Sequence, residues 1–192
     1  MTIRSESQRY GFGAVAFGLA GFAMYMVMIT VTLAKIEAMS GQIPFDMRLF
    51  GYSKLEATQL LDALGEDGRR YYLTRQIPLD TIYPALLAAT LISAIGWLRL
   101  RLPRNKLMRV GIVCSVSAAV FDYVENLGVV AMVLNWPNLS HPLVYAASSA
   151  SIAKSGMTTA AISIVLFLAA LGVVSFIKSR HYPRLSSSAK KS

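Results

Sequence analysis

Two carboxylic acids and an amide interrupt an otherwise apolar stretch of the chain. Asp122, Glu125 and Asn126 lie within Val110–Leu134, which is long enough to cross a bilayer as a helix. An Asp at the centre of such a helix costs about 2.5–3.5 kcal/mol to insert, so these groups indicate a functional site. The alternative is that the two carboxyl groups hydrogen-bond to other helices, to Asn126 or to a serine, and only fix the packing. Two carboxyl groups one helical turn apart can bind a cation, relay a proton or act as general acid and base.

A helical projection of this stretch separates two faces. At about 100° per residue, the three polar residues share one sector with small residues, and the branched apolar residues lie opposite. The polar sector also holds Ser115, Ala118, Ala119 and Val129, whereas the opposite sector holds Val113, Val116, Val120, Val124, Leu127 and Ala131. This pattern predicts a polar centre inside a helix bundle, with the branched face toward lipid.

A second candidate site lies at the start of Ile77–Leu98. Asp80 is followed at i+3 and i+4 by Tyr83 and Pro84, which fall on the same helix face. Pro84 has no N–H to donate to the Asp80 carbonyl, so that carbonyl and the carboxyl group can face the same place. The alternative is that Pro84 only kinks the helix while Asp80 lies at the membrane interface.

Lys154 is the basic residue expected to complete this site. It lies at the outer depth of the last apolar stretch, where it can pair with Glu125 or Asp80. The alternative is that its long side chain extends to the lipid headgroups.

The composition is that of a membrane protein. The chain has 192 residues, of which 55% are hydrophobic and 15% charged, and its mean hydropathy is +0.50. Apolar runs long enough to span a bilayer cover Ala14–Leu33, Ile77–Leu98, Val110–Leu134 and Ser155–Ile177. We therefore expect an all-α fold, a four-transmembrane-helix bundle in a single membrane domain over residues 1–182, followed by a disordered basic tail, 183–192.

Residues 35–76 are predicted to form a helical extracytoplasmic loop between the first two spans. Ser53 and Glu56 form a capping box, which predicts a short helix over 53–64 with Gly65 at its C-terminal stop.

Three residues outside the spans are secondary candidates for the site. Tyr72 and Arg75 suit anchoring at headgroup level, or recognition of an anionic headgroup. His141 lies in the second outer loop, but no spacing typical of a zinc or haem site surrounds it. No metal site is therefore expected, and the sequence identifies no cofactor.

The net charge of +9 follows the positive-inside pattern of membrane proteins rather than a nucleic-acid patch. The basic residues that set it flank the spans on one side: Arg4, Arg9, Arg99, Arg101, Arg104, Lys106, Arg109, Lys178, Arg180, Arg184, Lys190 and Lys191. We expect a multi-pass protein of the cell inner membrane with both termini cytoplasmic and no nucleic-acid partner. A single cysteine, Cys114, excludes an internal disulfide and a CxxC redox motif.

A set of short motifs along the chain resembles that of a group of small, uncharacterised four-span bacterial membrane proteins. The motifs are Gly51-Tyr52-Ser53, Glu56-Ala57, Leu64-Gly65, Gly68-Arg69, Tyr72-Leu73, Asp80 with Tyr83-Pro84, and Asp122-x-x-Glu125-Asn126. The resemblance implies the four-span topology and the helical outer loop, and it carries no activity. The loop order also looks like that of claudins, but the motif and cysteine pair of their first outer loop are absent.

Three functions remain open from the sequence. The first is binding of a small amphipathic ligand, a lipid headgroup or a cation in an outward-facing polar pocket within the membrane. The second is a membrane enzyme that uses Asp122 and Glu125 as acid and base on a lipid or isoprenoid. The third is a structural subunit of a larger membrane complex. The lipid bilayer is the expected partner in each case, and transport would suggest a homo-oligomer or a membrane complex, because four spans are few for a monomeric carrier.

Overall fold

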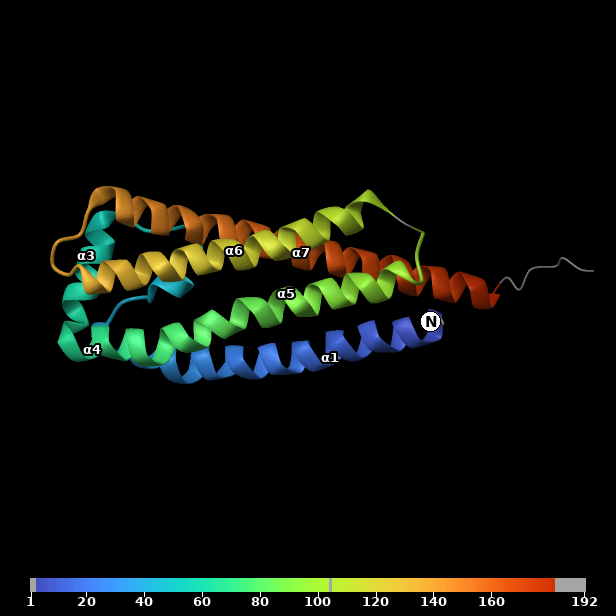
Figure 1. The fold of residues 1–192 in the computed structure, drawn as a ribbon, viewed down its shortest axis with the longest axis horizontal. Helices are drawn as coiled ribbons and strands as arrows, with labels where there is room; N and C mark the ends of the chain where they lie inside the picture. The colour runs from blue at the N-terminus through green and yellow to red at the C-terminus, as the bar shows by residue number, and fades with distance from the viewer. Residues whose placement is uncertain (1–2, 104, 182–192) are drawn as a thin grey trace, which may run out of the picture.

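The computed structural model describes residues 3–103 and 105–181, which form an all-α structure that is 87% helical. Figure 1 shows long helices lying side by side in an elongated bundle, with a short helix, α3, at one end. The predicted basic tail, 183–192, lies outside the described residues.

The first two long helices each contain a π-helical turn. The first runs through α1 (Ile3–Val27), the π turn η1 (Met28–Thr32) and α2 (Leu33–Ser40), and the second through α4 (Gly65–Tyr71), the π turn η3 (Tyr72–Gln76) and α5 (Ile77–Arg99). Between them lie a 3₁₀ turn, η2 (Phe45–Met47), and α3 (Lys54–Ala63), and the third and fourth long helices are α6 (Lys106–Leu134) and α7 (His141–His181).

Within the described residues, four helices are long and apolar enough to cross a membrane: Ser5–Ser40, Gly65–Arg99, Lys106–Leu134 and His141–Lys178. The two faces predicted for α6 are confirmed, since Ser115 and Val129 are each 1% exposed whereas Val113 is 62% and Leu127 70% exposed. Large apolar side chains left exposed along helices of this length indicate a membrane protein.

The first two helices extend further than their apolar runs alone predict. Residues expected in the outer loop continue the helices to Ser40 and from Gly65 onward. The extra turns are helical because they bury side chains against one another, as with Ile36, Tyr72 and Gln76, each 0% exposed. Tertiary contacts therefore stabilise helix beyond the stretch that hydropathy marks.

The helices pack in pairs, α1 along α5 and α6 along α7, with α5 next to α6. Gly128 of α6 permits the closest approach to α7, because an added Cβ would lie 2.6 Å from Ala147 Cβ and 3.3 Å from its Cα. Small residues allow backbones to approach in this way between helices in a membrane.

Residues 41–53, which we call the plug segment, bury Phe45 and Tyr52 in the bundle and leave Ile43, Leu49 and Phe50 exposed. Gly41 (φ 65°) and Gly51 (φ 79°) provide left-handed turns near its ends. Phe45 is 0% exposed, and its ring centroid lies 4.7 Å from that of Tyr52 and 6.1 Å from that of Tyr72. Figure 1 shows this segment running between α6 and the α1–α5 pair.

The helix that follows the plug segment begins as predicted. Ser53 Oγ accepts from the Glu56 N–H at 3.2 Å, and Glu56 Oε2 accepts from the Ser53 N–H at 2.7 Å, so the capping box is confirmed. Gly65, at φ 61°, follows the end of α3 at Leu64.

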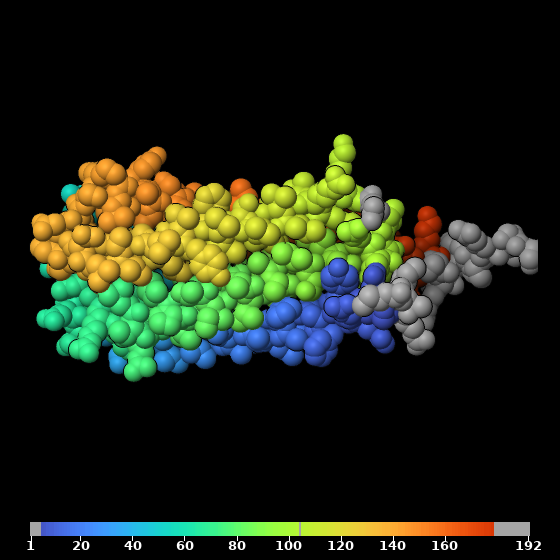
Figure 2. Space-filling view, in the orientation of Figure 1, coloured from blue at the N-terminus to red at the C-terminus, as the bar shows by residue number. Residues whose placement is uncertain are grey.

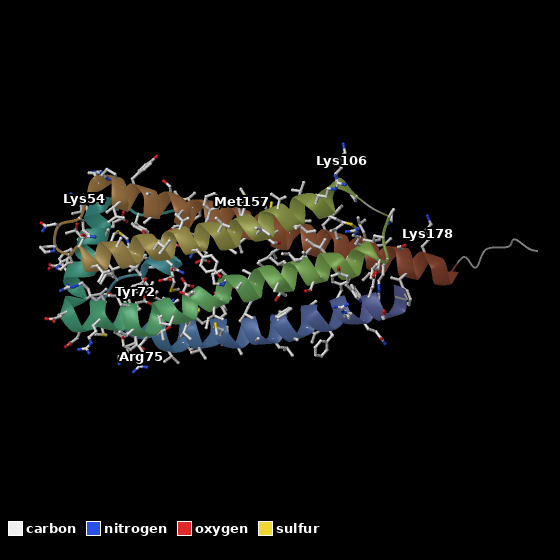
Figure 3. The ribbon with its side chains drawn as sticks, in the orientation of Figure 1. Lys54, Tyr72, Arg75, Lys106, Met157 and Lys178 are labelled. Carbon is white, nitrogen blue, oxygen red and sulfur yellow. The ribbon has the colours of Figure 1, made fainter. Side chains whose placement is uncertain are left out.

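The two ends of the bundle differ in charge. The start of α1, the α5–α6 link and the end of α7 lie together at the end opposite α3, which we call the basic end (Figure 1). Figure 3 shows Lys106 and Lys178 at this end and Lys54 at the α3 end. The predicted cytoplasmic side corresponds to the basic end, and the orientation itself stays a prediction.

Candidate polar site inside the bundle

An ion triad joins α6 to α7. Lys154 Nζ lies 2.5 Å from Glu125 Oε2 and 3.4 Å from Asp122 Oδ1. The side chains are 12% exposed for Lys154 and Asp122 and 2% for Glu125. Ser151, one turn before Lys154, donates its hydroxyl to the other Glu125 oxygen, Oε1. Of the two partners expected for Lys154, the structure pairs it with Glu125 rather than with Asp80.

The Asp80 carbonyl has the environment that Pro84 predicts. Because Pro84 cannot donate to it, the carbonyl accepts instead from Asn126 Nδ2 at 3.0 Å, across the α5–α6 interface. Asp80 itself is 3% exposed, so its carboxyl group also faces the interior, and it lies within electrostatic range of Asp46 and Asp122. The Asp80 side chain is therefore buried inside the bundle rather than exposed on its surface.

A fourth acidic group comes from the plug segment. Asp46 of η2 accepts from the Tyr72 hydroxyl through Oδ2 and from Gln76 Nε2 through Oδ1 at 3.3 Å. Gln76 in turn accepts from the Thr32 hydroxyl at 2.5 Å. One hydrogen-bond chain thus connects η1, η3 and the plug segment.

The two π turns contain three residues of this hydrogen-bond chain, Thr32 in η1 and Tyr72 and Gln76 in η3. η1 and η3 contact each other, and in each the backbone bond runs from residue i+5 to residue i, as from Leu33 N–H to Met28 O. A π turn widens the helix locally and is frequent at functional sites. In η3, Tyr72 and Gln76, four residues apart, are both fully buried.

Tyr52 closes the cluster from the plug segment. Its backbone N–H donates to Ser148 Oγ at 2.7 Å. Burial first, and then the nearby carboxyl groups of Glu125 and Asp46, raise the pKa of Tyr52 above its ordinary value. The Tyr52 phenol therefore keeps its proton. Its hydroxyl lies beside Ser151 but makes no hydrogen bond with a described residue.

The cluster has more acids than bases. Among the described residues it gathers the carboxyl groups of Asp46, Asp80, Asp122 and Glu125 around one lysine, Lys154. Asp80 Oδ2 and Asn126 Oδ1 are buried without a hydrogen-bond partner in the described part of the chain, and Glu125 Oε2 has only the lysine ion pair. Each buried acceptor left unpaired costs about 1–3 kcal/mol. No three described His, Cys, Asp or Glu side chains are arranged to hold a metal ion.

The predicted candidates fall into two groups. Asp80, Asp122, Glu125, Asn126 and Lys154 come together, and Tyr72 joins them through Asp46. Tyr83 is half-buried and stacks on Tyr25 of α1 at 5.7 Å between ring centroids, within electrostatic range of Asp122 and Asp80.

The remaining two candidates lie apart from the cluster. Arg75 and His141 are exposed, and no hydrogen bond or ion pair found within the described residues links either to it. Figure 3 shows Arg75 on the outside of the bundle and Tyr72 on the inside.

Sequence reasoning missed several members of the cluster: Thr32, Asp46, Tyr52, Gln76, Ser148 and Ser151. A shared polar face could have been predicted for three residues of α7, because a spacing of three residues places Ser148, Ser151 and Lys154 along one side of a helix. Asp46 lies in the predicted outer loop, and nothing local to it indicates that its side chain joins the cluster. The cluster is closed in this structure, with Asp80, Asp122, Glu125 and Asn126 each at most 9% exposed.

The chain was compared with protein-family models, with curated proteins and with solved structures, and none of the three comparisons found a match.

Proposed function

We propose that this membrane protein binds a small amphipathic ligand through a protonated amine, which the acid cluster receives. The observation that carries the proposal is the buried excess of acids over Lys154, in which the carboxyl group of Asp80 lies close to that of Asp46 and Asp80 Oδ2 has no N–H donor. A buried carboxylate needs a counter-charge or a hydrogen-bond donor. An ammonium group supplies both, whereas a neutral or anionic group supplies at most one.

Aromatic rings beside the cluster favour an organic ammonium group as the cation. Phe45, Tyr52 and Tyr72 form one contiguous set of rings, and Tyr72 donates directly to Asp46. Cations lie favourably over such rings, and amine-binding sites commonly combine rings with a carboxylate. The apolar remainder of the ligand would contact these rings.

The depth of the cluster favours entry from the α3 end. Asp80 is nineteen residues before Arg99, which corresponds to about 28 Å along the helix. With Arg99 at the basic-side interface, Asp80 would lie near the far boundary of a hydrocarbon core of about 30 Å. The ligand would therefore enter from the α3 end, past the plug segment, and would not have to cross the hydrocarbon core.

Binding requires the plug segment to move, because the cluster is closed. Gly41 and Gly51, both at positive φ, are the positions that can absorb a backbone change at its two ends. On its outer side the segment is held by an ion pair between Arg48 and Glu56 at 3.7 Å, in which the Arg48 side chain is 11% and the Glu56 side chain 51% exposed.

The test is thermal unfolding of the purified protein in detergent with octylamine, octanol and octanoate as matched probes. We expect octylamine alone to raise the unfolding temperature, since a ligand at one hundred times its Kd stabilises by about 2.7 kcal/mol. Asp80→Asn should abolish that response, whereas Asp62→Asn, which changes an exposed acid of α3, should keep it.

Three outcomes would contradict the proposal. They are equal stabilisation by octanol, a full response in Asp80→Asn, and a response to calcium or sodium chloride with none to octylamine. Should Asp80→Asn not fold, Glu125→Gln serves as the second variant, and its unfolding temperature without probe is measured first.

A further inference from the structure

A groove of about 820 Å³ lies between α5 and α7 at the basic end, whereas the acid cluster lies toward the α3 end. Its volume is within the usual range for small-molecule sites, about 300–1,000 Å³. α5 contributes Trp97, Leu98 and the adjoining Arg101, and α7 contributes Gly172, Val173 and Phe176. The walls are therefore apolar, with one cationic side chain among them.

Glycines shape this groove. Gly172 has no side chain to fill it, and an added Cβ there would meet only Leu98 Cδ2, at 3.6 Å. On the α1 side, a Cβ added to Gly11 would lie 3.2 Å from Trp97 Cδ1 and Nε1, so the indole is held against α1. The ring is consequently fixed as one wall.

Arg101 is placed at the mouth of the groove. Its guanidinium carbon lies 3.6 Å from the centroid of the Trp97 ring. A guanidinium stacked flat on a ring keeps its N–H groups at the edge, where they can bind a phosphate bidentately.

The charge around the mouth is positive. Arg99, Lys106 and Arg109 line a neighbouring hollow of about 350 Å³. Among the described residues, Glu6 is the acid at this end of the bundle, and it lies in a separate hollow with Arg9. The amine of a zwitterionic headgroup would need an acidic partner, and the described residues at the mouth of the groove include none.

The groove is continuous with the lipid-facing surface. Val173 is 58% and Phe176 59% exposed on α7, a helix apolar enough to span the membrane. Tryptophan and arginine together are typical of the level where hydrocarbon meets headgroups. An occupant would thus have an acyl chain along α7 and an anionic group near Arg101.

We propose that this groove is a binding site for one anionic phospholipid, whose phosphate is held by Arg101 stacked on Trp97 and whose acyl chain lies along Gly172 of α7. Basic pockets between spanning helices are suited to such headgroups. The inference does not depend on the amine-binding proposal, since the two sites share no residue.

The test is native mass spectrometry of the full chain released from bilayers of equimolar phosphatidylglycerol and phosphatidylcholine. We expect one phosphatidylglycerol to be retained, and Arg101→Gln to lower its retention by about ten-fold, the loss of one charge-assisted pair. Gly172→Leu should lower retention as well, because it fills the groove without changing charge. Arg70→Gln, an exposed arginine of α4, is the matched control and should retain the lipid.

Other results would overturn the proposal. Equal retention of phosphatidylcholine, or undiminished retention in Arg101→Gln, would show nonspecific lipid around the helices. Displacement by glycerol 3-phosphate alone would show a site for a soluble anion in place of a lipid. Unfolding temperatures of each variant are measured alongside, and if Arg101→Gln does not fold, Gly172→Leu decides the question.

Discussion

The half of the bundle near α3 and the half near the basic end are held together by different interactions. Near α3, one large buried cluster is centred on Phe45, Leu60 and Tyr72, and a hydrogen-bond chain and an ion triad lie beside it. Near the basic end there are two small apolar clusters, around Ile95 and around Leu91. Figure 2 shows the outer surface of both halves as one elongated body.

The difference indicates where the protein can be selective and where it can adapt. The α3 half fixes its helices through directional contacts with few alternatives, so a ligand there must match placed charges. The basic half is held mainly by apolar contacts, which are not directional, and it leaves a groove that lipid can fill. The following substitutions test this contrast.

The largest effect is expected at the ion triad. Lys154→Met leaves Glu125 and Asp122 buried without their cation, which should lower the free energy of unfolding by about 3–5 kcal/mol. Denaturant unfolding in detergent measures it, and Lys106→Met, an exposed lysine of the basic half, should have little effect. If the two variants had equal free energies of unfolding, the ion triad would not contribute more to stability than an exposed lysine of the basic half does.

The plug segment offers a comparison within a single stretch of chain. Phe45 is 0% and Phe50 93% exposed, so Phe45→Ala should lower the free energy of unfolding by about 3 kcal/mol and Phe50→Ala should leave it nearly unchanged. Thermal unfolding of the two variants is the measurement. If Phe45→Ala were neutral, the plug segment would not be part of the core of the α3 half.

Glycines allow the two halves to be compared by adding the same methyl group. Gly128→Ala places a Cβ 2.6 Å from Ala147 Cβ, a rigid atom next to the backbone, and should lower the unfolding free energy by about 1–3 kcal/mol. Gly111→Ala meets Ile95 Cδ1 at 2.9 Å and Ile164 Cγ2 at 3.0 Å, both methyl groups of side chains and neither next to the backbone, and should cost less.

Gly156→Ala, with nothing within 4 Å of the new Cβ, is the control for this pair and should be neutral or slightly stabilising. If Gly111→Ala lowered the free energy of unfolding more than Gly128→Ala does, the basic half rather than the α3 half would be the more rigid one.

The smallest effect is expected at the surface of the α3 half. Hydrogen bonds from Ser53, backbone first and then side chain, lower the pKa of Glu56 from its ordinary value. This contribution to stability is present above the ordinary glutamate range and is lost as the pH falls through the lowered folded-state pKa. Ser53→Ala should cost about 1 kcal/mol at neutral pH, and the difference should shrink in acid. Unfolding titrations at several pH values measure it, and a constant difference would contradict the capping box as its cause.

The sequence was sufficient for the helices and for much of the site. Hydropathy marks the spans, and the three-residue spacing from Asp122 to Glu125 is enough to place both groups on the inner face of α6. The absent N–H of Pro84 is enough to predict an unsatisfied Asp80 carbonyl. These are local rules, so they need no knowledge of the fold.

What could not be predicted depends on long-range contacts. Nothing near Asp46 indicates that it meets Gln76, thirty residues away. The π turns at Thr32 and Gln76 have no local signature and arise where two helices contact each other. The helices also continue past the apolar runs because Ile36 and Tyr72 bury there, which hydropathy windows do not detect.

The bond from Asn126 to the Asp80 carbonyl has a consequence for discrimination. By turning its NH₂ toward that oxygen, the amide presents only lone pairs on its other side, as Asp80 Oδ2 does. A proline in one helix thereby decides which way a neighbouring amide points. On the amine-binding proposal, esters, ethers and phosphates would face lone pairs opposed to their own, and a ligand would be favoured according to the number of N–H and O–H groups that it brings.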